Sequence, residues 1–140
     1  MTGGSFLAFD YGKRNTGVAV GSRQSGAAQP LTVLTAHAQE PDWEGIGKLI
    51  EEWRPRALVV GLPLNMDGSE NAITHAARKF GAALQARYNL PVHMVDERLS
   101  SRAATEMLLE AGVPLKRHKR MIDSRAAQTI LQTFLNDVPA

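Results

Sequence analysis

The chain has 140 residues, of which 44% are hydrophobic, and this length and composition predict a single domain over residues 1–140 with a buried core. The formal net charge is only +2, but residues 98–125 concentrate Lys and Arg, so we expect one basic face. The absence of cysteine excludes disulfides and thiolate metal sites. Since no apolar run suits a membrane span or a signal peptide, we expect a cytoplasmic protein with no membrane partner.

Short apolar runs and stretches of helical periodicity alternate along the chain. In order they predict strands at 5–10, 17–22 and 31–35, a helix at 42–53, a strand at 57–61, a helix at 72–88, a strand at 91–95, a helix from 100 or 101 to about 112, and a helix at 119–136. The first three strands are expected to be antiparallel, and the later strand–helix units to add parallel strands. The predicted class is α/β, with a mixed five-stranded sheet flanked by helices.

Carboxylates follow two of the predicted strands. Asp10 ends the first strand, although Asp is disfavoured in strands and costly to bury without a partner. Asp96 and Glu97 end the last strand. Ligands gather at the carboxyl ends of strands in α/β sheets, and side chains alternate between the two faces. We therefore expect Asp10 and only one of Asp96 and Glu97 to face a common site.

A third carboxylate, Asp123, falls on the apolar side of the last predicted helix, together with Ala126, Ala127 and Ile130. Each acid taken singly has an ordinary structural explanation, such as a cap or an ion pair. Three carboxylates brought together would repel one another unless a divalent cation joined them. Mg²⁺ and Mn²⁺ prefer oxygen ligands and support phosphodiester hydrolysis, so the set predicts a metal-dependent nuclease.

Four motifs cover almost the whole chain: FLAFDYGKRNTGVAVG, VVGLPLNMDGSE, VDERLSSRAATEML and IDSRAAQTIL. In this order and spacing they closely resemble the YqgF/RuvX family. The resemblance implies an RNase H-like fold and a hydrolase active in ribosome biogenesis, a nuclease that matures the 5′ end of pre-16S rRNA. It implies structured RNA, and ribosomal precursor particles, as partners. The family's acidic positions fall on Asp10, Glu97 and Asp123, which become the catalytic and metal-binding candidates, with Asp96 as a further metal ligand.

Basic and polar side chains near these acids are candidates for nucleic-acid binding. Those in the first turn, in the loop after residue 62, beside Glu97 and before Asp123 are Lys13, Arg14, Asn65, Ser69, Arg98, Lys116, Arg117, Lys119 and Arg120. The competing explanation is a solvated turn for the first pair, good turn chemistry for the loop and a solvated loop for the last cluster.

Other functions remain open at this stage. A Holliday junction resolvase acting on branched DNA would use the same carboxylates. A non-catalytic nucleic-acid-binding module could keep the fold without the activity. The Asp10 hairpin also resembles the first phosphate motif of actin- and hexokinase-like nucleotide-binding domains, which use two such domains. The chain is expected to be a monomer or a homodimer.

Overall fold

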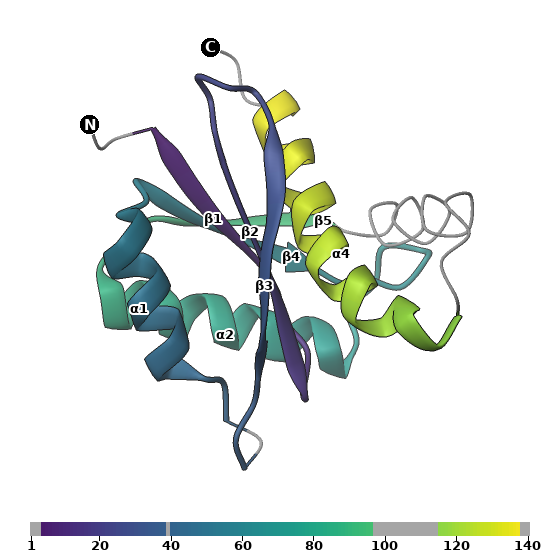
Figure 1. Ribbon diagram of the computed structural model, residues 1–140. Helices are drawn as coiled ribbons and strands as arrows, with labels where there is room; N and C mark the ends of the chain where they lie inside the picture. Colours follow the sequence, from purple (N-terminus) through teal and green to yellow (C-terminus); the bar gives the residue numbers. More distant parts are fainter. Residues whose placement is uncertain (1–3, 39, 97–114, 138–140) are drawn as a thin grey trace.

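The computed structural model describes residues 4–38, 40–96 and 115–137, without the side chains of residues 115–124 and 137 (Figure 1). Its elements are β1 (Ser5–Asp10), β2 (Asn15–Ser22), β3 (Ala28–Thr35), α1 (Trp43–Trp53), β4 (Ala57–Leu62), α2 (Ala72–Tyr88), β5 (Val92–Asp96) and α4 (Leu115–Asp137). The helix predicted from residue 100 or 101 to about 112 lies outside the described residues. None of the described helices has the length and apolar character needed to cross a bilayer.

The five strands form one mixed sheet in the order β3-β2-β1-β4-β5. β1 pairs antiparallel with β2, and β2 with β3, whereas β1–β4 and β4–β5 are parallel. This arrangement confirms the predicted sheet. It also means that β1, β4 and β5 end at the same edge, with β4 between the other two.

Two predicted boundaries differ from the structure by three residues or more. β3 begins at Ala28 rather than after Pro30, because β3 is an edge strand and Pro30 lies where the β2–β3 register shifts, positions at which a strand tolerates proline. The last helix begins at Leu115 rather than Lys119. The basic segment 116–120 therefore belongs to the first turns of α4 and is not a loop.

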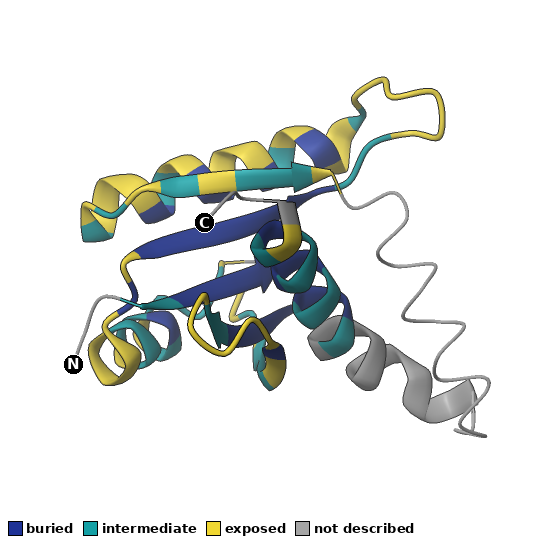
Figure 2. Ribbon diagram, turned by 90° about the horizontal axis from the view of Figure 1, so that it is seen from above, coloured by how far each residue is buried: buried dark blue, intermediate teal, exposed yellow. Residues whose placement is uncertain are grey.

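A hydrophobic layer covers each face of the sheet. On one face Phe6 and Ala8 pack with α4 through Ala127, Ile130 and Phe134. On the other face, residues of alternate parity such as Leu7 and Phe9 pack with α1 and α2. Figure 2 shows the consequence, since the inner strands are buried while the outer sides of the helices are exposed. Each strand residue is thus assigned to the α4 face or to the α1/α2 face.

Candidate functional site

Asp10 is the last residue of β1 and is half-buried. Its direct partner on β2 is Gly17. On β4, Phe9 pairs with Val60, so the next position beside Asp10 is Gly61. Both glycines are buried backbone positions without a side chain. The carboxylate of Asp10 therefore has no neighbouring side chain from either adjacent strand at its own level.

The face on which Asp10 lies follows from strand alternation. Phe6 and Ala8 are packed against α4, and Asp10 is the next residue of the same parity. Tyr11 instead packs with the cluster on the α1/α2 face. Asp10 thus belongs to the α4 face, at the edge where the parallel strands end.

Asp96 ends β5 and is exposed. The same-parity residues Val92 and Met94 pack on the α1/α2 face, whereas Val95 packs against the α4 core. Alternation therefore assigns Asp96 to the face opposite Asp10. Asp96 also lines a concave region together with Thr133 and Phe134 of α4, and Glu97 lies outside the described residues.

The helix that carries Asp123 is fixed to the sheet by its second half. The rings of Phe134 and Phe6 meet edge to face with centroids 5.2 Å apart, and His93 of β5 tilts against Phe134 with centroids 5.0 Å apart. Gln132 accepts a hydrogen bond from the Ala28 backbone N–H at 3.0 Å and donates one to the Gly26 carbonyl at 2.9 Å. These contacts hold the carboxyl-terminal half of α4 over the start of β1.

The path of α4 decides how far its earlier residues reach. Figure 1 shows β1 and α4 running in opposite directions along the sheet. The helix from position 123 to Phe134 is about 16 Å long, at 1.5 Å per residue. The strand from Phe6 to Asp10 is about 13 Å long, at 3.3 Å per residue. The similar lengths favour position 123 near the Asp10 end of the sheet, while the side chain of Asp123 is outside the described part.

No group of three potential metal-ligating side chains occurs within the part of the chain that the structure describes. Glu97 and the side chain of Asp123 lie outside this part, so the predicted set of three ligands stays a prediction. What the described residues do provide is one carboxylate, Asp10, beside two glycines. A carboxylate at the end of a strand suits a hard cation, which takes oxygen ligands from protein, water and phosphate together.

The turn between β1 and β2 carries Lys13 and Arg14, and both are exposed. A Cβ at Gly12 would collide with the Asn15 carbonyl oxygen, so this tight turn depends on glycine. The Arg14 carbonyl accepts a hydrogen bond from the Ala36 N–H at 2.7 Å, which ties the turn to the end of β3. Two cations are thereby held next to the end of β1.

The loop between β4 and α2 bonds mainly to itself. Asn65 donates to the Ser69 hydroxyl at 2.9 Å, and that hydroxyl donates to Asp67 at 2.6 Å. Asn71 donates from its side chain to the Asn65 side-chain oxygen at 2.7 Å. Asn65 and Ser69 are exposed, so substrate contact stays a prediction, but their described hydrogen bonds serve the loop.

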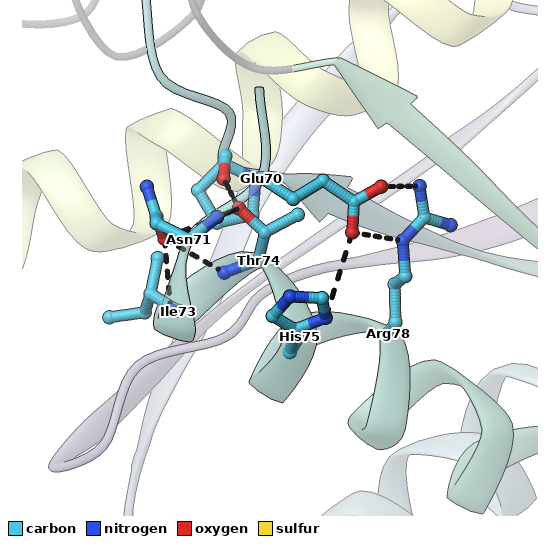
Figure 3. Close-up of polar contacts among 7 residues, drawn as sticks. Glu70, Asn71, Ile73, Thr74, His75 and Arg78 are labelled. Atoms are coloured by element: carbon cyan, nitrogen blue, oxygen red, sulfur yellow. Dashed lines mark hydrogen bonds and ion pairs between the residues drawn. The ribbon is translucent and has the colours of Figure 1, made fainter. Parts of the chain in front are cut away.

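Asn71 caps α2, a role that the sequence reasoning missed. Its side-chain oxygen accepts from the N–H groups of Ile73 at 2.9 Å and Thr74 at 3.1 Å, while the Thr74 hydroxyl accepts from the Asn71 N–H (Figure 3). Thr74 also donates to the Pro63 carbonyl. An Asn three residues before a Thr at the start of an apolar helix was the available signal. These helix N–H groups are occupied by the cap.

Beside this cap, Glu70 accepts two hydrogen bonds from Arg78, at 3.1 and 2.8 Å, and His75 lies 3.7 Å from the same carboxylate (Figure 3). The hydrogen bond from Arg78 lowers the pKa of Glu70 below its ordinary value. The bonded pair braces the first turns of α2.

The remaining basic candidates, Arg98 and the side chains of Lys116, Arg117, Lys119 and Arg120, lie outside the described residues.

Comparison with known proteins identifies the family to which this chain is similar. The profile of a family described as "RuvX: Holliday junction resolvase" matches residues 4–137. A Neisseria gonorrhoeae protein named "Putative pre-16S rRNA nuclease" is 47% identical over 137 residues, covering 98% of this chain and 91% of the relative. A Nitrosococcus oceani protein of the same name is 51% identical over 132 residues, covering 94% of this chain and 86% of the relative.

Solved structures support the fold. The Thermus thermophilus RuvC structure in complex with a Holliday junction substrate has a TM-score of 0.56 at 18% identity and covers 94% of this chain and 93% of its own. The fowlpox virus resolvase in its complex with Holliday junction DNA also has a TM-score of 0.56, at 8% identity, with 94% and 98% covered. At these identities the likeness is one of fold, and it confirms the expected RNase H-like α/β class.

Proposed function

Since the chain belongs to the RuvX family of Holliday junction resolvases, we propose that it is a divalent-metal-dependent nuclease that hydrolyses phosphodiester bonds. The observation that carries the proposal is the position of Asp10. It lies at the carboxyl end of β1, on the face covered by α4 and between two glycines of the adjacent strands. This is where carboxylates from different elements could converge.

Asp10, Glu97 and Asp123 are the proposed metal ligands. Asp96 is the weaker candidate, because alternation along β5 assigns it to the opposite face from Asp10. The same alternation favours the neighbouring position, which supports Glu97. Asp123 is supported by its distance along α4 from Phe134, the residue that packs on Phe6.

A bound Mg²⁺ or Mn²⁺ would supply Lewis acidity, activating water and stabilising charge on the phosphate. The chain's own contribution is to hold the carboxylates in place and to leave room for the substrate. Gly17 and Gly61 provide that room, because neither adjacent strand places a side chain beside Asp10.

Basic residues would hold the nucleic-acid backbone near the carboxylates. Lys13 and Arg14 are exposed in a turn that is anchored to β3, directly after β1. Lys116, Arg117, Lys119 and Arg120 belong to the first turns of α4, before Asp123. Cations that come shortly after Asp10 and shortly before Asp123 in the chain suit a polyanion whose cleaved phosphate meets the metal while flanking phosphates meet Lys and Arg.

For the substrate we propose the 5′ end of pre-16S rRNA, in ribosome biogenesis in the cytoplasm. The support comes from relatives named "Putative pre-16S rRNA nuclease", which are 44–51% identical to this chain over nearly its whole length. Branched DNA is the second candidate, because the family description names a Holliday junction resolvase. Both substrates need the same hydrolytic step, so only a direct comparison of RNA cleavage with DNA cleavage distinguishes the two candidates.

The test is parallel cleavage of a pre-16S rRNA fragment with its 5′ extension and of a synthetic four-way DNA junction. Each is incubated with wild type, Asp10→Asn and Asp42→Asn, with Mg²⁺ or Mn²⁺ and with EDTA. Asp42→Asn is the matched control, because Asp42 caps α1 through the Gly45 N–H at 3.0 Å and Asn caps a helix as well as Asp.

We expect metal-dependent RNA cleavage by wild type and Asp42→Asn. Asp10→Asn should lose at least about 100-fold in rate, since even residues that only support metal ligands contribute 10- to 100-fold. Full activity in Asp10→Asn would rule out the proposed site. Cleavage of the junction but not of the RNA would favour the resolvase.

A further inference from the structure

A second concave region lies on the α1/α2 face, between the start of α1 and the middle of α2. Its volume is about 490 Å³. Tyr11, Trp43 and Phe80 are among its lining residues, and so are the charged residues Lys79, Arg87 and Glu40. The pocket thus combines flat aromatic surfaces with a mainly cationic rim, and the proposed nuclease site does not use it.

The aromatic side chains form a fixed surface. Trp43 stacks on Phe80 with centroids 5.7 Å apart and an angle of 27° between the rings. Tyr11 lies against Phe80 with centroids 5.0 Å apart. The Tyr88 hydroxyl donates to the Trp43 carbonyl at 3.3 Å and so ties the start of α1 to the end of α2. Phe80 is buried, whereas Tyr11 and Trp43 are half-buried and face the pocket.

The charged side chains suit an anion. The guanidinium carbon of Arg87 lies over the Trp43 ring, 4.1 Å from its centroid, which is within the range of a cation–π interaction. Within the described residues, neither Arg87 nor Lys79 forms an ion pair. Glu40 is the one carboxylate among the lining residues. The two cations on α2 therefore give the pocket a positive balance.

An unpaired nucleotide has the matching chemistry. Its base is a flat ring that stacks on aromatic side chains and on Arg guanidinium planes, while its phosphate binds Lys or Arg. Glu40 could accept a hydrogen bond from an amino group of the base. A purely apolar ligand would leave Lys79 and Arg87 without use, and a base inside a duplex could not reach the aromatic rings.

The pocket is connected to the proposed nuclease site through β1. Tyr11 directly follows Asp10, but the two residues belong to opposite faces of the sheet. A single strand that crosses the carboxyl end of β1 could therefore place one phosphate near Asp10 and a neighbouring base in the pocket. The paired region of a hairpin or junction could not make that crossing.

We propose that this pocket binds an unpaired nucleotide adjacent to the cleaved bond and so selects substrates with single-stranded extensions. This inference rests on the proposed nuclease function for its biological meaning. Binding to the pocket can nevertheless be measured without cleavage.

Binding is measured by fluorescence anisotropy in EDTA, with Asp10→Asn as the background so that the nucleic acid stays intact. The probes are a labelled RNA hairpin with a short 5′ single-stranded extension, the same hairpin with a blunt end, and the DNA counterparts of both. Ala83→Leu fills the pocket, because Ala83 lines it. Ala86→Leu is the matched control, an identical change at an exposed position of α2 outside the pocket.

We expect Ala83→Leu to weaken binding of the extended RNA hairpin by about 10-fold, the lower range for one lost stacking contact. Ala86→Leu should stay within about twofold, and the blunt hairpin should bind all variants alike. If Ala83→Leu weakens binding of the extended DNA hairpin to the same degree, the pocket accepts a nucleotide with either sugar. Unchanged affinity of Ala83→Leu for both extended probes, in a protein with a native circular dichroism spectrum, would overturn the proposal.

A second pair of variants covers the case in which Ala83→Leu does not fold. Lys79→Gln removes a pocket cation, and Lys48→Gln removes an exposed lysine of α1 that pairs with Glu44, at 3.5 Å. We expect Lys79→Gln, but not Lys48→Gln, to weaken binding of the extended hairpin more than binding of the blunt hairpin. If wild type cleaves RNA while neither pocket variant affects binding, the pocket proposal fails alone; if pocket-dependent binding persists without cleavage, the nuclease proposal fails alone.

Discussion

Asp10 of β1 lies directly opposite Gly17 of β2 in the antiparallel ladder. Directly opposed residues of such a pair share a face, with their Cβ positions about 5 Å apart. Any side chain at position 17 would therefore stand next to the Asp10 carboxylate, on the face that α4 covers. The absence of a side chain there is part of the proposed site.

Gly17→Val is expected to lower nuclease activity by at least about 10-fold, because the added methyl groups take up the space next to Asp10 where a cation and phosphate must fit. Initial cleavage rates at a saturating concentration of Mn²⁺ test this. Circular dichroism checks folding, since valine is a favourable strand residue. Wild-type rates in a folded Gly17→Val protein would show that this space is not used.

Ala127→Leu should reduce both stability and activity. Ala127 is fully buried between α4 and the sheet, so a larger side chain must push the helix away, at a cost of about 1–3 kcal/mol. The same displacement would move position 123 relative to Asp10. Urea unfolding and cleavage rates measure the two effects, with the exposed Ala86→Leu as the control that should change neither. If Ala127→Leu loses stability but keeps full activity, the packing of α4 does not control the proposed nuclease site.

Two glycines of α1 should respond in opposite ways to alanine. A Cβ at Gly47 would make an ordinary contact of 3.5 Å with the Tyr88 hydroxyl, so Gly47→Ala should stabilise the protein by about 0.5–1 kcal/mol through helix propensity. A Cβ at Gly45 would come within 2.6 Å of an Asp42 carboxylate oxygen. Gly45→Ala should therefore disturb the cap and destabilise α1. Thermal unfolding of both variants gives the comparison, and equal shifts would contradict it.

The Glu70–Arg78 pair predicts a small pH-dependent effect. The pKa of Glu70 is lowered in the folded protein, so its stabilising contribution is present above the ordinary pKa and is lost as the pH falls through the lowered value. Arg78→Gln should lower the melting temperature at neutral pH, and the difference from wild type should shrink below about pH 4. A pH-independent difference would assign the effect to something other than this carboxylate. Arg56→Gln is the control, an exposed arginine without an ion pair in the described residues.

The local pattern of the sequence was sufficient to predict the strands, α1 and α2, and it made Asp10 a candidate site residue. Apolar runs and helical spacing are properties of neighbouring residues, and a carboxylate at the end of an apolar strand stands out without any partner. The start of β3 was not predictable in this way. Pro30 breaks an isolated strand, but an edge strand with a register shift has no ladder bond to lose there.

Only the tertiary structure decided how distant residues meet. The strand order puts β4 between β1 and β5, which makes Gly61 a neighbour of Asp10, and strand parity assigns Asp96 to the opposite face. Trp43 packs against the core on the α1/α2 face and also lines a pocket with Arg87 of α2. The sequence by itself determined the family and the kinds of side chain. Packing across the sheet determined which of them share a face, because that depends on pairings between segments far apart in the chain.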